Sequence, residues 1–288
     1  MKRIVLFILC SFFALAITAK TVTPATSLPA YYEKIDGKSG KALFDAVQTV
    51  TKTGYSSLGY DGLWSAYQYT DLHENGYVWD MYSDCTWKSL SSNRCGNYSN
   101  ECDCYNREHS IPQSWWGGGT SGIGCDIFHV LPTDGYVNNR RGNLPFGEVS
   151  SASYTSHNGS KVGGGKGIVN SQKTIAASSG TTTSAPGGNV FEPINQYKGD
   201  LARGIMGTMA SWNKDLTSSE GSKFFKSSYT VATNFGLTPY GVALLMKWHR
   251  QDPVSQKEID RNNGIQATQG NRNPFIDYPY LAEYIWGE

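Results

Sequence analysis

Five of the six cysteines lie between Cys85 and Cys125, so the compartment in which this chain folds decides which structures are open to it. The N-terminus indicates that compartment, because two basic residues precede an apolar run from Ile4 to Ile17 that small residues close. This is the pattern of a secretory signal peptide, and the run is too short to span a bilayer comfortably. We therefore expect residues 1–19 to be removed and residues 20–288 to be secreted, either into the medium or into a periplasm.

Cysteines that remain after export pair with one another in an oxidising compartment. The five in question predict two disulfides and one odd thiol, and they are Cys85, Cys95, Cys102, Cys104 and Cys125. A zinc site is the alternative, although no Cys-x-x-Cys spacing supports it. No later segment is apolar enough to cross a membrane, so we expect no membrane association and a monomer.

The charge of the chain is nearly balanced. Removing Lys2 and Arg3 with the signal peptide changes the formal net charge from +1 to −1. Proteins that bind nucleic acid are often strongly basic. Any contact with phosphate must therefore come from a local group of basic residues.

Hydrophobic periodicity predicts helices in the first part of the chain. From about residue 39 to residue 51 one helical face collects the apolar residues Leu43, Phe44, Val47 and Val50. A second helical stretch surrounds Trp64, and the segment Gly76–Tyr82 resembles a strand.

Residues 150–190 are rich in Ser, Gly and Thr, and they predict either a linker between two domains or long loops and short strands within one. We favour a single domain. The C-terminal third is helical in pattern: Asp200 stands where it could cap one helix, and Thr238-Pro239 and Asp252-Pro253 resemble two further helix starts. The chain is thus mixed α and β, with helices outnumbering strands.

The first candidate site is the segment REHSIP, Arg107 to Pro112. Glu108 and His109 are adjacent, and on a regular strand their side chains would point to opposite faces. Both can serve one site only if the strand ends or bulges there, which Pro112 favours. Two surface polar residues are the alternative interpretation of this pair.

The second candidate site is the block CDIFHVLPTDGYVNNRRGNLPFG, Cys125 to Gly147. Asn138 and Asn143 supply neutral, hard oxygens that suit Mg²⁺ or Ca²⁺. Arg140 and Arg141 supply planar forks for phosphate oxygens. A loop of turns with solvated arginines is the alternative.

Together these blocks resemble the endonuclease I family of secreted or periplasmic non-specific nucleases, within the His-Me finger (ββα-metal) superfamily. Two later blocks extend the resemblance: FEPINQYKGDLAR at 191–203, and WHRQDPVSQKEIDRNN with QGNRNPFID between 248 and 277. Four ordered blocks span nearly the whole mature chain.

The resemblance implies an α+β fold, in which a His-Me finger core is embedded in a mainly helical, mixed single domain. It implies that His109 is the general base, on a β-hairpin, and that Glu108 and Asn138 hold one divalent ion, with Asn138 on the helix that crosses the hairpin. The ion is expected to be Mg²⁺, with Mn²⁺ or Ca²⁺ as alternatives. Asp126, His129 and Asn143 are expected to support the site.

The implied reaction is hydrolysis of DNA, with RNA as a further substrate, without strong sequence preference and with 5′-phosphate products. Members of the family carry an arginine that contacts the scissile phosphate, in an interval that here contains no basic residue, SIPQSWWGGGTSGIGC. Arg141 is our candidate for that contact, and the other candidate nucleic-acid contacts are Arg140, Lys198, Arg203, Arg261 and Arg272. For Arg203 and Arg261 the alternative is a salt bridge, with Asp200 or Asp260.

Two other functions compete with this one. A metal-dependent phosphodiesterase for small or lipid substrates would favour a closed aromatic pocket. A secreted, non-catalytic binding protein could carry the same polar residues on its surface, where they would have no catalytic role.

Overall fold

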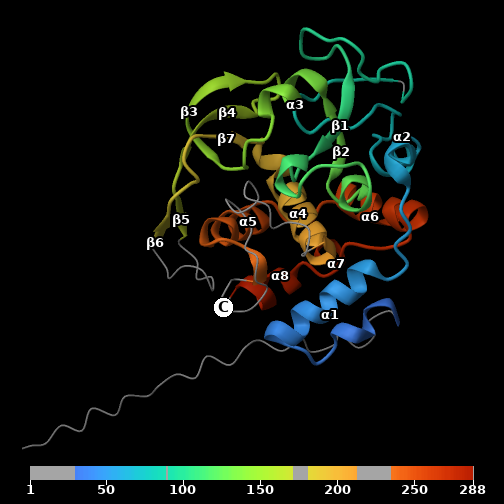
Figure 1. Ribbon diagram of the computed structural model, residues 1–288, viewed down its shortest axis with the longest axis vertical. Coiled ribbons are helices and arrows are strands. Elements are labelled where there is room, and N and C mark those ends of the chain that lie inside the picture. The colour runs from blue at the N-terminus through green and yellow to red at the C-terminus, as the bar shows by residue number, and fades with distance from the viewer. Residues whose placement is uncertain (1–29, 89, 171–180, 213–234, 288) are drawn as a thin grey trace, which may run out of the picture.

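The computed structural model describes residues 30–88, 90–170, 181–212 and 235–287. Helices and strands are mixed, with most of the helices in the lower part and most of the strands in the upper part of Figure 1. The α-helices are α1 (Gly40–Lys52), α2 (Gly59–Thr70), α3 (Gly135–Arg141), α4 (Lys198–Trp212), α5 (Pro239–Gln251), α6 (Gln256–Gln269), α7 (Pro274–Asp277) and α8 (Tyr280–Trp286). Short 3₁₀ helices are η1 (Ala30–Ile35), η2 (Gln113–Trp115), η3 (Gly122–Cys125) and η4 (Asn195–Tyr197).

The strands form three small antiparallel sheets. They are β1 (Tyr105–His109) with β2 (Val130–Asp134), then β3 (Glu148–Thr155), β4 (Lys161–Lys166) and β7 (Asn189–Glu192), and finally β5 (Ile168–Asn170) with β6 (Thr181–Thr183). The described part of the Ser/Gly/Thr-rich segment therefore forms paired strands. Val162 and Phe191 from these strands join the main hydrophobic core, which also contains Tyr32 and Trp286.

Helices α1 and α5 begin and pack as their sequences predict. The predicted apolar face of α1 is fully buried, and α1 and α5 both contact the central helix α4. At the start of α5 the Thr238 side chain accepts a hydrogen bond from the Gly241 N–H, with Pro239 in the first turn. None of the helices in the described ranges combines the length and apolarity that a membrane span requires.

Two other helix starts differ from the prediction. Asp252 is the C-cap of α5, and α6 begins at Gln256, after a capping box made by Ser255 and Glu258. The reciprocal bonds of a capping box satisfy two backbone N–H groups, which an Asp-Pro start cannot match. Asp200 lies inside the first turn of α4, which begins at Lys198.

The segment Gly76–Tyr82 is not a strand. Its only ladder contact is the isolated bridge between Leu72 and Val78. The reason is Asp80, whose buried carboxylate accepts hydrogen bonds from the backbone N–H groups of Tyr82, Ser83 and Cys85. These bonds fold the chain into a turn.

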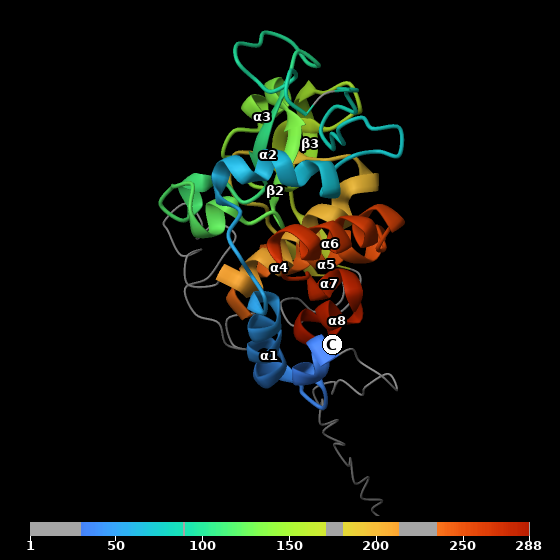
Figure 2. The same cartoon turned by 90° about the vertical axis from the view of Figure 1, so that its right-hand side faces the viewer.

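Strands β1 and β2 and helix α3 form one compact unit. Glu108 pairs with Leu131 and His109 with Val130. Strand β1 ends at His109, and an early end of the strand was one of the two conditions under which Glu108 and His109 could serve one site. Helix α3 follows β2 directly, because the Asp134 side chain accepts a hydrogen bond from the Val137 N–H. Helix α3 contacts both strands, while α2 packs against α6 on the side shown in Figure 2.

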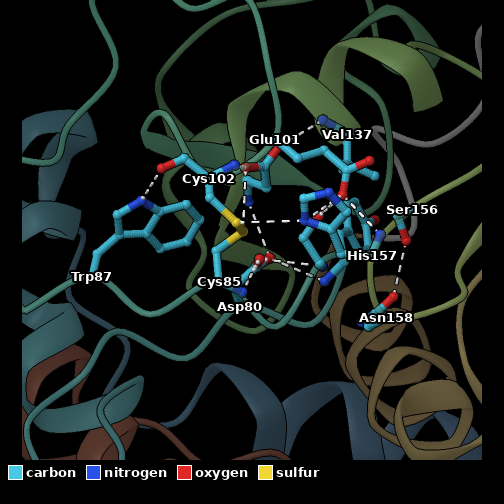
Figure 3. Close-up of a disulfide and its surroundings, with 12 residues drawn as sticks. Asp80, Cys85, Trp87, Glu101, Cys102, Val137, Ser156, His157 and Asn158 are labelled. Atoms are coloured by element: carbon cyan, nitrogen blue, oxygen red, sulfur yellow. Dashed lines mark hydrogen bonds and ion pairs between the residues drawn. A yellow bond between two sulfur atoms is a disulfide. The ribbon is translucent and has the colours of Figure 1, made fainter.

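Two disulfides and one free thiol confirm the cysteine prediction. Cys85 is bonded to Cys102 and Cys95 to Cys104, and Cys125 is free and buried. In the part of the chain that the structure describes, one group of three metal-ligand side chains lies close enough to hold an ion: Cys85, Cys102 and His157 (Figure 3). The two sulfurs are bonded to each other, so they offer no thiolate, and the zinc alternative is not supported.

Candidate active site

The two sequence blocks meet in one cavity of about 320 Å³, which we call the cleft. It is bordered by β1, by α3 and the turn after it, and by residues from α2 and from the loop before β1. Most of its lining side chains are polar: Tyr60, Tyr98, Asn106, Arg107, Glu108, His109, Pro112, Gln113, Asn138, Asn139, Arg141, Gly142 and Asn143. The structure thus brings together Glu108, His109, Asn138, Arg141 and Asn143 from the predicted set.

Glu108 is buried, and one of its two oxygens is engaged by protein groups. Its Oε1 accepts hydrogen bonds from the Tyr82 hydroxyl at 2.8 Å and from Arg141 Nη1 at 2.7 Å. Burial raises the pKa of the Glu108 carboxyl, and the positive charge of Arg141 opposes that rise. Oε2 accepts no hydrogen bond from the described residues, so it is the oxygen that remains for a cation.

Asn138 stands on α3 with its amide oriented by β1. Its Nδ2 donates a hydrogen bond to Asn106 Oδ1 at 2.7 Å, and no described residue donates to the Asn138 Oδ1 atom. Asn106 and Glu108 are two residues apart on β1, so both lie on the same face of the strand. A carboxylate oxygen and an amide oxygen in one cleft fit a hard divalent cation such as Mg²⁺.

His109 has a fixed orientation and no charge at neutral pH. Its Nε2 lies 3.1 Å from the Gly124 carbonyl oxygen, which can only accept, so Nε2 carries the proton and Nδ1 keeps its lone pair. The ring packs between Tyr60 and Trp116, with centroid distances of 5.9 Å and 5.7 Å. Burial, with a contribution from His129, lowers the pKa of His109 to about 3.

Arg141 occupies a different position from the one proposed for a phosphate contact. It is 1% exposed; Nη1 donates to Glu108 Oε1 and to the His109 carbonyl oxygen at 2.8 Å, and Nη2 donates to the Ser110 carbonyl oxygen at 2.6 Å. Both Nη atoms are therefore committed to protein acceptors. Arg141 orients Glu108 and the end of β1 from beneath the cleft.

The other predicted nucleic-acid contacts lie outside the cleft. Arg140 is exposed on α3 and donates to the Tyr136 hydroxyl. The remaining four are in ion pairs: Lys198 with Glu192, Arg203 with Glu258, Arg261 with Asp71 and Arg272 with Asp277. The salt-bridge alternative for Arg203 and Arg261 is thus confirmed, with Glu258 and Asp71 as the partners in place of Asp200 and Asp260.

Two of the predicted supporting residues lie behind the cleft. The His129 ring is 5.7 Å from the ring of His109, and its Nε2 bonds the Ile123 carbonyl oxygen. Asp126 is fully buried and accepts hydrogen bonds from Trp212 and Gln269. It therefore connects the segment before β2 to the ends of α4 and α6, and it does not line the cleft.

Arg107 is the cleft residue that the sequence interpretation missed. Its guanidinium lies 3.4 Å from the Tyr60 ring centroid and 4.4 Å from that of Trp64. Its Nη1 donates to the Tyr60 carbonyl oxygen and, at 3.2 Å, to the exposed carboxylate of Asp61. Nε and Nη2 have no acceptor among the described residues. The signal was present in the sequence, because residues two apart on a strand share a face, and Arg107 precedes His109 by two.

Comparisons with known proteins agree on one family. The family model described as Endonuclease I matches residues 39–280. An extracellular ribonuclease of Bacillus amyloliquefaciens is 30% identical over 280 residues, which cover 93% of this chain and 82% of that protein. An extracellular ribonuclease of Bacillus subtilis (strain 168) is 29% identical over 279 residues, with the same coverage of 93% and 82%.

Proposed function

Because the chain belongs to the endonuclease I family, we propose that it is a secreted, metal-dependent endonuclease that hydrolyses the phosphodiester bonds of DNA and RNA with little regard for sequence. One observation carries the proposal: Glu108, Asn138 and His109 line a single cleft, and each keeps one acceptor atom that no described residue bonds. The order β1, β2, α3, with His109 ending the first strand and Asn138 in the helix, supports a His-Me finger core.

Glu108 Oε2 and Asn138 Oδ1 would hold one divalent ion, with Mg²⁺ favoured and Mn²⁺ or Ca²⁺ as alternatives. Such an ion supplies positive charge to the phosphate oxygens and the leaving O3′. Arg141 keeps the Glu108 carboxylate ionised and aligned, since it donates to Oε1 and to two backbone carbonyls of the same segment. Tyr82 supports the same oxygen from the other side.

His109 Nδ1 would take the proton of the attacking water. A base must be neutral to do so, and burial keeps this imidazole neutral. The hydrogen bond from Nε2 to Gly124 fixes the tautomer in which Nδ1 is the acceptor. As the water oxygen bonds phosphorus, the bond from phosphorus to O3′ would break, and O3′ would take a proton from solvent, which leaves a 3′-hydroxyl and a 5′-phosphate.

Arg107, which lines the cleft, would be the basic side chain that contacts the phosphate, in place of Arg141. Its guanidinium is held by two aromatic rings, and it keeps two nitrogen atoms for a non-bridging oxygen. Arg107→Lys should lower kcat by about tenfold or more, because lysine lacks the planar fork. Arg94→Lys is the matched control, since Arg94 also stacks on Trp64 but does not line the cleft.

Water as the nucleophile makes the 2′-hydroxyl unnecessary, so both sugars would be substrates. This agrees with the name ribonuclease carried by both relatives. Contacts to phosphate and sugar carry no direct sequence information, which accounts for the proposed lack of preference.

The test is cleavage of supercoiled plasmid and of RNA with Mg²⁺, Mn²⁺, Ca²⁺ or chelator, followed by analysis of the new ends. We expect cutting of both polymers with a divalent ion, none with chelator, and 5′-phosphate ends. His109→Ala should abolish cutting with little change in thermal midpoint, whereas His73→Ala, outside the cleft, should leave activity intact.

Two results would exclude the proposal. RNA products ending in 2′,3′-cyclic phosphate would show that the 2′-hydroxyl, and not water, attacks. A protein that hydrolyses only small phosphodiesters, or only binds nucleic acid, would match one of the two competing functions.

A further inference from the structure

An aromatic side chain stands at the cleft with no partner of its own. Tyr98 lies on the loop of residues 95–104, which we call the tyrosine loop and which precedes β1 at the top of Figure 1. Tyr98 lines the cleft together with His109 and Asn138, and its side chain is half-buried. No hydrogen bond or ring contact to its side chain exists within the described ranges, so neither polar bonding nor ring stacking inside the protein accounts for its place at the cleft.

The tyrosine loop is held by bonds that do not involve the Tyr98 ring. The Cys95–Cys104 disulfide closes it. Inside it, the Asp103 carboxylate accepts hydrogen bonds from the backbone N–H groups of Ser99 and Asn100 at 2.8 Å and 2.9 Å. The backbone on the C-terminal side of Tyr98 is therefore fixed by the loop itself.

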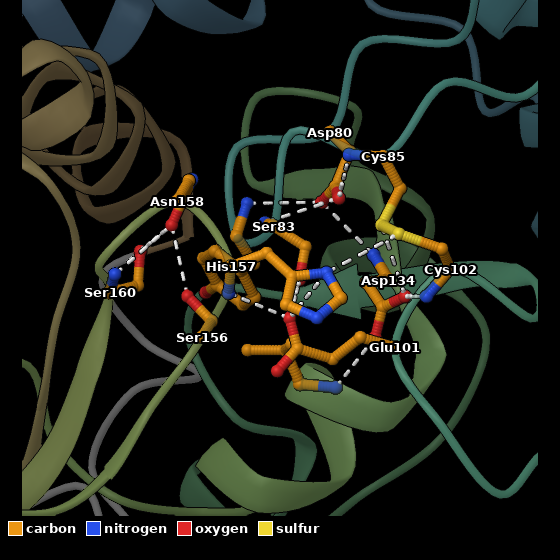
Figure 4. Close-up of polar contacts among 12 residues, drawn as sticks. Asp80, Ser83, Cys85, Glu101, Cys102, Asp134, Ser156, His157, Asn158 and Ser160 are labelled. Carbon is orange, nitrogen blue, oxygen red and sulfur yellow. Dashed lines mark hydrogen bonds and ion pairs between the residues drawn. A yellow bond between two sulfur atoms is a disulfide. The ribbon is translucent and has the colours of Figure 1, made fainter.

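A second set of contacts fastens this loop to the elements that carry the site. The Cys85–Cys102 disulfide is one, and the Asp134 carboxylate is another, because it accepts from the Cys102 N–H at 2.7 Å and also begins α3, the helix of Asn138 (Figure 4). Glu101 accepts from the Ser83 hydroxyl and the His157 N–H, and from the Tyr154 hydroxyl. The tyrosine loop thus has a fixed position relative to the cleft.

An unpartnered aromatic ring on a fixed loop, beside a phosphodiester site, suits one ligand group, the face of a nucleobase. Stacking of bases on aromatic side chains tolerates any sequence, because every base has a π-face. A ring whose backbone is already fixed loses less conformational entropy when a base stacks on it than a ring on a mobile loop. A paired base in a duplex is stacked on its neighbours and would first have to leave them.

We propose that Tyr98 is a base-stacking platform for a nucleotide next to the scissile phosphate, and that the enzyme therefore selects unpaired strands over duplexes. This inference rests on the proposed nuclease function and adds its substrate class. No described residue bonds the Tyr98 hydroxyl, so the ring alone would carry the selection.

The experiment compares wild type, Tyr98→Phe and Tyr98→Ala on three substrates: a single-stranded oligonucleotide, the same sequence as a duplex, and a strand whose central residues are abasic tetrahydrofuran units. We expect Tyr98→Ala to lower kcat/KM on the single strand by a factor of about 5 to 150, the range for one lost stacked base. The loss should vanish on the abasic strand, and Tyr98→Phe should behave as wild type.

The inference is overturned if Tyr98→Ala cuts the single strand as wild type does, or if its loss is equally large on the abasic strand. The second result would mean that Tyr98 supports the cleft without contacting a base. If wild type cuts none of the three substrates, the proposed nuclease function itself fails, which is a distinct outcome.

Discussion

The ion pair of Glu108 and Arg141 decides what each residue can do. Both side chains are almost completely buried, at 3% and 1% exposure, and their atoms are 2.7 Å apart. A buried pair adds little net stability, but removing one partner leaves an uncompensated charge. Arg141 is therefore better understood as the group that holds the Glu108 carboxylate, the proposed metal ligand, than as a contact for the substrate.

This gives a prediction for stability. Arg141→Met should lower the free energy of unfolding by about 3–5 kcal/mol, because Glu108 would be left charged and buried. The neighbouring, exposed Arg140→Met should change it by no more than about 0.5 kcal/mol. Urea unfolding at pH 7 measures both, and equal effects of the two substitutions would contradict a structural role for Arg141.

The sequence pattern anticipates which residues line the candidate site but not which arginine joins them. Glu108, His109 and Asn138 could be chosen because a carboxylate, an imidazole and an amide recur in short blocks that match a family. The arginines could not be assigned, since a guanidinium binds a carboxylate and a phosphate with the same geometry. Only the fold shows that Arg203 faces Glu258 and that Arg107 faces the cleft.

At the scale of elements, local patterns were reliable where local bonds decide the structure. The apolar face of α1 and the Thr238 cap of α5 both follow from residues within one or two turns. The segment Gly76–Tyr82 differs because Asp80 also accepts the N–H of Asp134, which is distant in the sequence. The hydrophobic periodicity of a segment does not indicate a hydrogen bond to a residue so far away in the sequence.

The tyrosine loop yields a prediction at this scale. Replacing Cys95 and Cys104 by Ser removes the disulfide that closes this loop, whose two cysteines are nine positions apart in the sequence. We expect a loss of about 2–3 kcal/mol in the free energy of unfolding, from loop-closure entropy alone. The preference for single strands should shrink as well, since Tyr98 would no longer be held.

Cys125→Ser is the matched control for that double substitution. Cys125 is free, and its Sγ donates to the Thr120 carbonyl oxygen, a bond that a serine hydroxyl can also make. It should leave the single-strand preference unchanged. If removal of the disulfide leaves both stability and preference as in wild type, the loop is fixed by other contacts.

Across the whole molecule, most of the basic residues that we predicted to contact nucleic acid are instead in ion pairs, and burial keeps the buried histidines neutral. Among the described residues, the basic side chains that line the cleft are Arg107 and the buried Arg141. His249 is one of these buried histidines, and burial together with the adjacent Arg203 lowers its pKa to about 4.

This shift fixes the sign of a pH effect. The unfolded chain binds a proton at His249 near pH 6.5, whereas the folded protein does not until about pH 4, so acid favours the unfolded state. Between pH 7 and pH 5 this residue should remove roughly 2 kcal/mol of stability. Above pH 7 it should have no effect.

His249→Gln isolates that contribution from those of other groups. The difference in unfolding free energy between wild type and the variant should fall by roughly 2 kcal/mol from pH 7 to pH 5. A difference that stays constant over this range would mean that His249 titrates normally in the folded protein. Denaturant unfolding at several pH values provides the comparison.

The most direct measurement of the central claim is calorimetric titration of Mg²⁺ and Mn²⁺ into the protein, for wild type, Glu108→Gln, Asn138→Ala, Asn139→Ala and His109→Ala. Glu108 and Asn138 are proposed to hold one ion, whereas Asn139 and His109 line the same cleft without binding it. We predict one site in wild type, in Asn139→Ala and in His109→Ala, with affinity lost in Glu108→Gln and Asn138→Ala. Unchanged ion binding in both of these variants would contradict the account.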